Sequence, residues 1–428
     1  METRTKRLAV TVTLTSSLAL GRYDLRAQET AGDACLPGAR LRGAAAQVLL
    51  ADGACPAGHR DGPRHVGPAD CPFGTLFEGE APALFRDCLP ARATDVLPAT
   101  AMSCGHSPGF RTQRGPERGH GVFDTLIDRA FWETLRPGGL LYLPRCPRPE
   151  CGARVEPCRS FYGRRAAAGT RSYFQSRVAS RVLLRAAVDR ARRVADPGTA
   201  HAVPVVAEAY RDDGEGPGGL QPTTFHGEVI VLDGENAALL ADALRRVDHL
   251  GGGTSRGLGA VRVEVEDGAP ESPLAGRLEN FARGVSVRRS QYARLAPLSS
   301  ASLEGAYFTI DLRSDALLRR HGWEPTVVLH ADLLQSATGV GDPSLSLVRA
   351  YAEPGWRGGW HEAWGLPRPV ELVARRGSCY LFRTNDLGAW TGALEALEWT
   401  GLGARTSEGY GDVRVCDPFH LVLREQAV

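Results

Sequence analysis

The chain opens on a regular alternation of apolar and polar side chains. Apolar residues at every second position from Leu8 to Leu14 alternate with Ala9 and three threonines. This two-residue period predicts a strand with threonine on one face. The basic residues before it, Arg4, Lys6 and Arg7, also resemble the start of a secretory signal, but the threonines make the following stretch too polar for a signal core, so the strand is favoured.

Clear periodic elements return at residue 225 and occur twice in a similar order. The patterns predict a strand over 225–232, an amphipathic helix over 235–250 and a strand over 260–266, then strands over 306–312 and 378–383, a helix over 388–400 and a strand over 412–417. In both copies a glycine-rich loop separates the last helix from the last strand. The chain therefore has two similar units joined by a connector over 268–300.

The region between the first strand and residue 225 is less regular. Pro37 and Gly38 predict a turn, followed by a short helix over 44–50 that has Arg40 and Arg42 at its start. From 52 to 170 the sequence is rich in Gly, Pro, Cys and Arg, and only 120–135 predicts a helix. The segment 176–195 fits a helix or a strand equally well, and both interpretations remain open. An irregular region of this length needs something other than an apolar core to hold it together.

The two glycine-rich loops are related in sequence. Residues 251–263 align with 403–415, and eight of the thirteen positions are identical. The identical pairs are Gly251/Gly403, Thr254/Thr406, Ser255/Ser407, Gly257/Gly409, Gly259/Gly411, Val261/Val413, Arg262/Arg414 and Val263/Val415. With the same helix, loop and strand context, the match indicates an internal duplication.

The loops do not fit a nucleotide-binding motif. They lack a Walker A lysine, and they run from helix to strand, so no helix N-terminus follows to receive a phosphate. What they offer is exposed backbone with Thr and Ser hydroxyls, which can lie against a sugar-phosphate chain, and Arg256 and Arg405 add charge. The alternative is a structural turn with glycines at positive φ.

Composition and charge narrow the class of protein. The 428 residues are 43% apolar and 23% charged, which excludes a disordered, collagenous or polytopic membrane protein. We therefore expect a soluble, cytoplasmic protein. Of the 51 basic residues all but Lys6 are arginine, and residues 154–193 hold eleven arginines against two acids. Arginine suits phosphate contacts, and Tyr162, Tyr173 and Phe174 within this run suit base stacking, although a solvated face or a coding bias explains arginine equally well.

Eight of the ten cysteines lie in the first 158 residues. Uneven clusters in a long chain suit zinc or free thiols better than a disulfide scaffold. Cys146 and Cys151 enclose a turn like that of a zinc knuckle, and Cys104 and His120 are the best candidates for the other ligands. His106 and Cys158 remain alternatives for the fourth position. We expect a structural zinc that folds the insertion, with unliganded cysteines as the alternative.

The loop sequences LGGGTSRGLGAVRV and GARTSEGYGDVRV resemble the glycine-rich loops of the RAMP superfamily, the repeat-associated proteins of CRISPR effector complexes. LPGARLRGAAA and DCPFGTLFEGE are similar to segments that follow the first strand in that superfamily. With the cysteine-rich insertion and WGLPRPVEL, the whole chain looks most like the large two-domain RAMP subunit of subtype III-D systems. Glu408 stands where many superfamily loops have a basic residue, so the second loop is the better candidate for a packing role.

The resemblance implies an α+β fold with two ferredoxin-like (RRM-like) domains, each an antiparallel sheet backed by helices. The domains would span 7–267, with the zinc-binding insertion at 52–170, and 301–428. The implied partners are guide RNA, the backbone RAMP subunits, the large polymerase-like subunit and, indirectly, target RNA, but no membrane. The expected RNA-binding residues are Arg40, Arg42, Gly251, Gly252, Gly253, Thr254, Ser255, Arg256, Gly257, Gly259, Gly403, Arg405, Thr406, Ser407, Gly409, Tyr410 and Gly411.

The expected function is that of a non-catalytic guide-RNA-binding subunit that holds the 5′ repeat-derived tag. The rival is an endoribonuclease that processes the guide precursor, which needs a positioned base and acid. The candidates for those roles, none in a distinctive motif, are His226, His249, His321, His330 and His361, while Asp24 and Asp311 are the candidates for a metal-dependent cleavage. A third possibility is a zinc-dependent scaffold that meets only protein partners.

Overall fold

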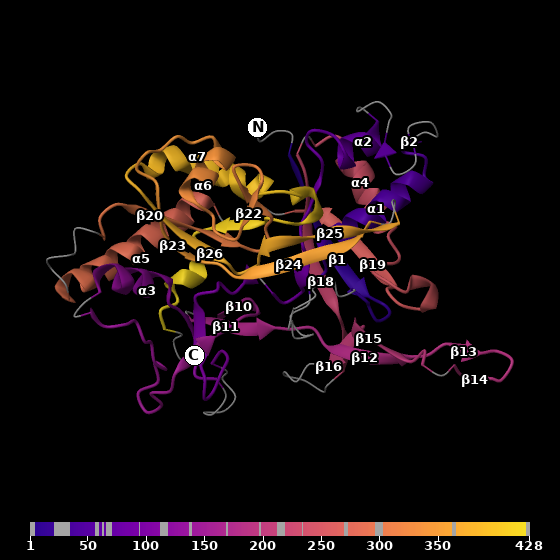
Figure 1. Cartoon of the computed structure of the whole chain (residues 1–428), viewed down its shortest axis with the longest axis horizontal. Coiled ribbons are helices and arrows are strands. Elements are labelled where there is room, and N and C mark those ends of the chain that lie inside the picture. Colours follow the sequence, from indigo (N-terminus) through magenta and orange to yellow (C-terminus); the bar gives the residue numbers. More distant parts are fainter. Residues whose placement is uncertain are drawn as a thin grey trace.

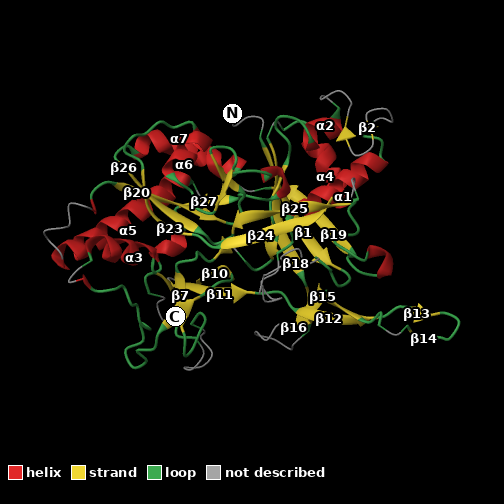
Figure 2. Cartoon of the chain, viewed as in Figure 1, coloured by secondary structure: helices red, strands yellow, loops and turns green. Residues whose placement is uncertain are grey.

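The computed structural model is a mixed α+β structure built from antiparallel sheets (Figures 1 and 2). It describes the chain except for residues 1–4, 21–34, 56–59, 62–63, 66–70, 94, 112–118, 137–138, 168–169, 197, 212–218, 233, 269–272, 296–302, 362–364 and 425–428. Two core sheets, each backed by helices, form the two halves of the molecule, and smaller β-ribbons extend from them.

The sheet of the first half has the strand order β19-β1-β18-β4, with all neighbours antiparallel. Its strands are β1 (Lys6–Leu14), β4 (Leu84–Phe85), β18 (Thr224–Val231) and β19 (Val261–Asp267), and β5 (Leu89–Pro90) also pairs with β18. The predicted alternation in β1 is confirmed, because Leu8, Val10, Val12 and Leu14 are all buried. They belong to one apolar core with residues of α1 (Gly38–Ala51) and α4 (Ala237–Arg245), and α1 begins six residues before its predicted start.

The sheet of the second half has the order β23-β26-β20-β27, again fully antiparallel. Its strands are β20 (Ala306–Leu312), β23 (Ser346–Tyr351), β26 (Cys379–Thr384) and β27 (Val413–Val415). The helices α6 (Ala331–Thr338) and α7 (Leu387–Thr400) contribute Leu334, Trp390 and Leu394 to its core. The predicted strands and the predicted last helix are confirmed, whereas α6 and β23 were not predicted.

Both halves have the same topology. Each reads strand, helix, strand, strand, helix, strand along the chain, with the first and third strands in the centre of the sheet. In each half a long β-hairpin lies between the second and third core strands. We call residues 180–206 the first arm and residues 354–374 the second arm.

The first arm pairs β12 (Ser180–Arg185) with β15 (His201–Val206), and β13 (Val188–Asp189) with β14 (Val194–Ala195) at its tip. The second arm pairs β24 (Pro354–His361) with β25 (Leu366–Ala374). The first arm projects away from the rest of the molecule, and the second crosses the first half (Figure 1). The open question about 176–195 is therefore answered in favour of strand.

The remaining elements are short and surround the two core sheets. They are α2 (Pro72–Phe77), α3 (Leu126–Leu135), β2 (Arg60–Asp61), β3 (Arg64–His65), β6 (Asp95–Val96), β7 (Ala101–Cys104), β8 (Val122–Asp124), β9 (Val155–Pro157), β10 (Phe161–Ala167), β11 (Thr170–Ser176), β16 (Ala209–Arg211), β17 (Leu220–Pro222), β21 (Leu318–Arg320) and β22 (Glu324–Thr326). The predicted helix over 120–135 is wrong in its first part, which is strand β8. The helix starts only at Leu126, where the Asp124 carboxylate accepts a hydrogen bond from the Leu126 N–H.

The connector is not an irregular linker. It forms α5 (Leu274–Leu295), a 22-residue helix whose residues Leu274, Leu278, Phe281 and Val285 are buried in the core of the second half. These residues repeat at intervals of three and four, which is the period of a helix face. The connector therefore belongs structurally to the second half.

Buried ion pairs join the two halves. Arg86, next to β4, lies 2.6 Å from the Asp412 carboxylate of the second half, and both side chains are about 90% buried. Asp95 pairs with Arg313 and Arg414. Burial acts against ionisation of Asp95, but the two guanidinium groups outweigh it and lower the pKa of that carboxyl. Leaving one of these charges without its partner would cost about 3–5 kcal/mol, so the halves are firmly connected.

Among the described residues, the structure has no helix with both the length and the apolar character needed to span a membrane.

Candidate functional site

The two glycine-rich loops have the same backbone conformation. We call residues 251–259 the first loop and residues 403–411 the second loop. Each contains one 3-10 turn, Thr254–Arg256 in the first loop and Thr406–Glu408 in the second. Aligned positions share positive φ angles: 78° and 89° at Gly251 and Gly403, 74° and 61° at Gly253 and Arg405, 75° and 98° at Gly257 and Gly409, and 77° and 70° at Gly259 and Gly411. The duplication inferred from sequence is therefore also a duplication of local structure.

Equivalent hydrogen bonds hold both loops. Leu250 N–H donates to the Gly259 carbonyl, and Leu402 N–H donates to the Gly411 carbonyl, both at 2.8 Å. A Cβ at Gly259 would lie 2.0 Å from the Leu250 carbonyl oxygen, and one at Gly411 would lie 1.9 Å from that of Leu402. Packing of the loop alone therefore requires glycine at this pair of positions, whatever the loop binds.

The repeat extends beyond the loops into segments that the sequence comparison missed. The Ser16 hydroxyl accepts a hydrogen bond from Ala260 N–H, and the Ser314 hydroxyl accepts the equivalent bond from Asp412 N–H. Each arm is attached in the same way: Leu18 forms a bridge with Val206 of the first arm, and Ala316 forms one with Ala374 of the second. In each half, the end of the first core strand, the arm and the glycine-rich loop are therefore joined by equivalent contacts.

The first loop faces solvent. Residues 252–257 are all exposed, while Leu258 is buried and packs with Ala19 and Val205, where the first arm joins the body. The hydroxyls of Thr254 and Ser255, their backbone N–H groups and the guanidinium of Arg256 have no hydrogen-bond partner among the described residues. The Arg185 side chain of the first arm donates to the Arg256 carbonyl at 3.1 Å. The arm and the loop therefore meet through this bond.

Much of the arginine-rich run noted in the sequence lies on this first arm. Arg181 pairs with Glu208 at 2.8 Å and also donates to the Ser17 hydroxyl at the base of the arm. Towards the tip Arg190, Arg192 and Arg193 are exposed. The surface that continues from the first loop is thus basic, as contact with a phosphate backbone requires.

The second loop packs against the first half instead of facing solvent. A Cβ at Gly409 would lie 2.7 Å from the Asp87 carboxylate, 2.9 Å from the Phe85 carbonyl oxygen and 3.3 Å from the Gly38 nitrogen. Its charges are paired within the chain: Glu408 bonds to Arg368 and Arg405, both at 2.7 Å. Burial acts against the Glu408 charge, but these arginines keep the pKa of the carboxyl below its usual value.

Arg405, Thr406 and Ser407 of the second loop are also partly covered. The Arg405 guanidinium lies over the ring of Tyr410 at 4.8 Å and reaches Glu371 of the second arm at 3.0 Å. Thr406 and Ser407 are half-buried. The structure thus gives the two loops different surroundings, and Glu408, the residue that departs from the RAMP pattern, lies in the covered one.

Arg40 and Arg42, both predicted to contact RNA, are half-buried on α1. Arg40 donates to the Leu20 carbonyl at 3.1 Å, and Arg42 donates to the Phe77 carbonyl at 2.6 Å with its guanidinium over the Phe77 ring. Burial lowers the pKa of Arg42. Both arginines have partners within the chain, so their charges are less available to RNA than that of the exposed Arg256.

We expect alanine to be tolerated differently at the equivalent glycines 257 and 409. Both have positive φ and so share a backbone penalty of about 1–2 kcal/mol. A Cβ at Gly257 meets no atom within 4 Å, whereas one at Gly409 meets Asp87 and Phe85. In urea unfolding, Gly409→Ala should therefore lose about 1–3 kcal/mol more than Gly257→Ala. Equal losses would show that the second loop does not support the contact between the halves.

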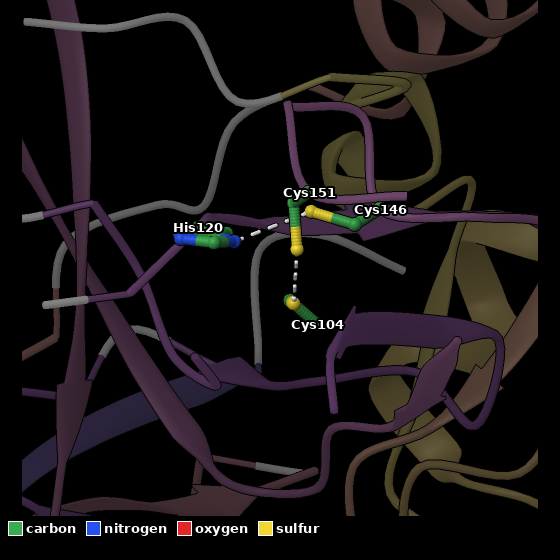
Figure 3. Close-up of side chains that lie close together, drawn as sticks. All are labelled: Cys104, His120, Cys146 and Cys151. Atoms are coloured by element: carbon green, nitrogen blue, oxygen red, sulfur yellow. Dashed lines mark hydrogen bonds between the residues drawn. The ribbon is translucent and has the colours of Figure 1, made fainter. Parts of the chain in front are cut away.

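The four predicted metal ligands lie together (Figure 3). The ligand atoms of Cys104, His120, Cys146 and Cys151 are all within 4.8 Å of one another. The Cys104 and Cys151 sulfurs are 3.7 Å apart, and the Cys146 sulfur is 3.4 Å from His120 Nδ1. Zinc bound to thiolates at ~2.3 Å in a tetrahedron requires sulfurs roughly 3.8 Å apart, so the spacing fits a four-coordinate metal ion.

Neighbouring groups favour the thiolate form at Cys104. Burial acts against it, but the backbone N–H groups of Ser107 and His106 and the neighbouring thiols lower the pKa of Cys104. Burial raises the pKa of Cys146 to about 11, and a bound cation would have to offset that cost. His120 turns Nδ1 to the cluster, while Nε2 lies 3.1 Å from the Arg148 guanidinium. A metal on Nδ1 puts the ring proton on Nε2, so Arg148 would have to turn away.

The cluster lies at one end of a small three-stranded sheet of order β8-β7-β9. Cys104 ends β7, His120 precedes β8, and the turn with Cys146 and Cys151 precedes β9, so ligands are attached to all three strands. Of the alternative fourth ligands, His106 is exposed and Cys158 packs with an apolar cluster; neither joins the group of four. The four residues favoured from sequence are thus brought together, although His120 precedes a strand and not the predicted helix.

The described candidate ribonuclease residues lie on different elements of the structure. Asp24 lies outside the described residues. His226 is exposed on β18, and His249 is exposed and pairs with Asp248. His330 precedes α6, His321 lies in a turn and His361 ends β24. The backbone thus places these five histidines on separate elements.

Asp311 is buried in an ionic cluster that sequence reasoning missed. His420 is completely buried, with Nε2 at 2.7 Å from Asp311 and Nδ1 at 3.2 Å from Asp124. Burial disfavours a charged imidazole, but the two carboxylates outweigh it and hold the pKa of His420 well above its usual value. Asp124 ends β8, so the cluster fastens the sheet of β7, β8 and β9 to the second half. A buried Asp311 already paired in this way cannot reach a substrate.

Comparisons with known proteins give limited information. No family model matches the sequence, and no curated protein matches it. A solved chain described as "Cryo-EM structure of the Type III-B Cmr-beta bound to cognate target RNA and AMPPnP, state 1" is similar at 11% identity and a TM-score of 0.33, over 87% of this chain and 86% of that one. Chains from the complex bound to cognate target RNA and from its apo state have 12% and 11% identity, TM-scores of 0.30, and cover 60% and 61% of this chain and 96% and 97% of their own. At these TM-scores the likeness does not establish a shared fold.

Proposed function

We propose that this chain is a non-catalytic guide-RNA-binding subunit of a type III CRISPR antiviral effector complex, which holds the 5′ repeat-derived tag of the guide through its first glycine-rich loop. The observation that carries the proposal is the contrast between the duplicated loops: the same backbone conformation is exposed in one and packed in the other. The motif resemblance to RAMP proteins indicates the class of complex.

The first loop would bind RNA through its backbone and short side chains. Gly252 and Gly253 leave the backbone open to a close approach, and the N–H groups and hydroxyls of Thr254 and Ser255 can donate to phosphate oxygens. Arg256 and the exposed arginines of the first arm would add electrostatic attraction along the strand. Contacts of this kind position RNA without reading many bases, as suits a tag of constant sequence.

The second loop would keep the backbone conformation of the first loop but pack against the first half instead of binding RNA. Its contacts with the first half and the pairing of Arg405 with Glu371 and Glu408 leave little charge for RNA. We therefore assign RNA binding mainly to Gly251, Gly252, Gly253, Thr254, Ser255, Arg256, Gly257 and Gly259.

We also propose that both halves, 7–267 and 301–428, are ferredoxin-like domains. Their shared order of strands and helices, with the first and third strands central, supports this assignment. The insertion would bind one structural zinc ion at Cys104, His120, Cys146 and Cys151, which supplies a crosslink and no chemistry. The backbone RAMP subunits and the large polymerase-like subunit would be protein partners, and target RNA would be met through the guide.

A salt titration of labelled repeat-tag RNA, read on native and denaturing gels, tests the proposal. The RNA should stay intact and bind with an affinity that falls as salt rises, and Arg256→Ala should reduce the slope of log affinity against log salt by about one. Shortened RNA would instead identify the processing nuclease. Affinity independent of salt, or no binding, would favour the zinc-dependent scaffold.

A further inference from the structure

An apolar segment that belongs to no helix or strand lies on the surface near the cluster of Cys104, His120, Cys146 and Cys151. We call residues 140–143 the leucine edge. Leu140, Leu141 and Leu143 are 65%, 78% and 71% exposed, respectively, while Tyr142 between them is half-buried. Leucine side chains of this exposure at adjacent positions are uncommon on a monomer and usually mark an interaction site.

The backbone of this segment is also unpaired. Among the described residues, the N–H and C=O groups of Leu141, Tyr142 and Leu143 have no hydrogen-bond partner. A row of free donors and acceptors can pair with an extended strand of another chain. Leu141 and Leu143 face outward and Tyr142 inward, an alternation that suits such pairing.

Two anchors hold the two ends of the leucine edge. At its start the Trp132 indole N–H of α3 donates to the Leu140 carbonyl at 2.8 Å. At its end Arg145 forms a bridge with Arg154, and Cys146 of the metal cluster follows directly. Tyr142 packs near the Trp132 ring, with centroids 6.3 Å apart. The segment is therefore prearranged, which reduces the entropic cost of pairing with a partner.

Charge indicates what kind of strand would pair there. Between residues 134 and 155 the sequence has four arginines, at 136, 145, 148 and 154, and one acid, Glu150. Arg136, Arg145 and Arg154 are exposed. A second copy pairing antiparallel about Tyr142 would place Arg136 opposite Arg148, so like charges oppose self-association. An apolar strand flanked by Asp or Glu would be complementary.

We infer that the leucine edge is a docking site for an extended, acid-flanked apolar strand of another protein subunit, which adds to it by β-pairing. The choice of partner rests on the proposed function, because the candidate partners are the other protein subunits of the effector complex. The cluster of Cys104, His120, Cys146 and Cys151 would then do more than fold the insertion, because it fixes one end of the leucine edge.

Hydrogen-deuterium exchange tests this inference on the purified chain and on the complex isolated from cells that express all its subunits. Amides of Leu141, Tyr142 and Leu143 should exchange freely in the isolated chain and at least tenfold more slowly in the complex. The double variant Leu141→Asp/Leu143→Asp should remain folded and bind RNA but fail to join the complex. The matched control is Val287→Asp/Leu295→Asp, which alters similarly exposed apolar residues, 55% and 64%, on α5 and should join it.

Other outcomes overturn the inference in distinguishable ways. If the chain joins the complex while the leucine edge exchanges freely, the docking site is wrong and the proposed function stands. If RNA alone protects the edge, or the purified chain dimerises through it in sedimentation, its partner is not a protein subunit. If the wild-type chain binds tag RNA but joins no complex, docking and the assembly part of the proposed function both fail.

Discussion

Replacing His420 by Gln should destabilise the second half by about 3–5 kcal/mol, the cost of leaving buried charges without their partner. The substitution removes the cation that lies between Asp311 and Asp124 and leaves two buried carboxylates facing each other. Urea unfolding at pH 7 measures the loss. The matched control is His249→Gln, because His249 is also paired with an aspartate but at the surface, where such a pair contributes about 0–1 kcal/mol.

The pH dependence of stability gives a second measure of the same cluster. The pKa of His420 is raised in the folded state, so its stabilising contribution is complete below the unfolded pKa of about 6.5. It is lost as the pH rises through the folded value. The difference in stability between wild type and His420→Gln should therefore shrink as the pH is raised above neutrality. A difference that is small at pH 7, or that grows with pH, would contradict a charged His420.

Loss of metal should unfold the sheet formed by β7, β8 and β9. Structural zinc contributes on the order of 10 kcal/mol to small metal-folded modules, and this sheet has ligands on every strand. Purified protein should contain one equivalent of zinc, and Cys146→Ser should release it. Limited proteolysis should then cut within residues 97–125 or 136–160, while α3 and the two core sheets stay protected, because the apolar cores to which they belong do not include the cluster.

Two cysteines provide controls for the metal prediction. Cys158 lies in the same region but outside the cluster, and Cys379 is buried in the core of the second half. Cys158→Ser should keep the metal and the proteolysis pattern of wild type. Cys379→Ser should also keep the metal, whatever it does to stability. Full-length protein that contains no metal and resists proteolysis between 97 and 160 would show that the four residues pack without an ion.

The sequence predicts the core strands well because each has a local signal. Alternation marks β1 and apolar runs mark β18 and β26, and all three are strands. The helix α5 was missed although its buried residues Leu274, Leu278, Phe281 and Val285 have helical spacing; many arginines around them hide the pattern. The false helical start at 120–124 has another cause, because three residues of β8 are too few to show any period.

The candidate site was predictable where the chemistry is local. The cysteine pair in a turn predicts candidate metal ligands by residue type and spacing, and the structure brings Cys104 and His120 to it. His420 could not be found in this way, because Asp124 and Asp311 are distant in sequence and their approach depends on the whole fold. The packing of the second loop likewise depends on contacts with Gly38 and Phe85, which are distant in sequence. Only Glu408 distinguished the second loop from the first in the sequence itself.

If the exposed first loop binds RNA and its duplicate does not, the same added charge should affect the two loops differently. The most direct test compares Ser255→Glu with Ser407→Glu, which place a carboxylate at equivalent positions, and measures the affinity of each variant for repeat-tag RNA at fixed salt. Ser255→Glu should weaken binding about tenfold or more, since a carboxylate there opposes phosphate, and Ser407→Glu should stay within about twofold of wild type. Unchanged affinity in Ser255→Glu, or a larger loss in Ser407→Glu with the fold intact, would contradict this prediction.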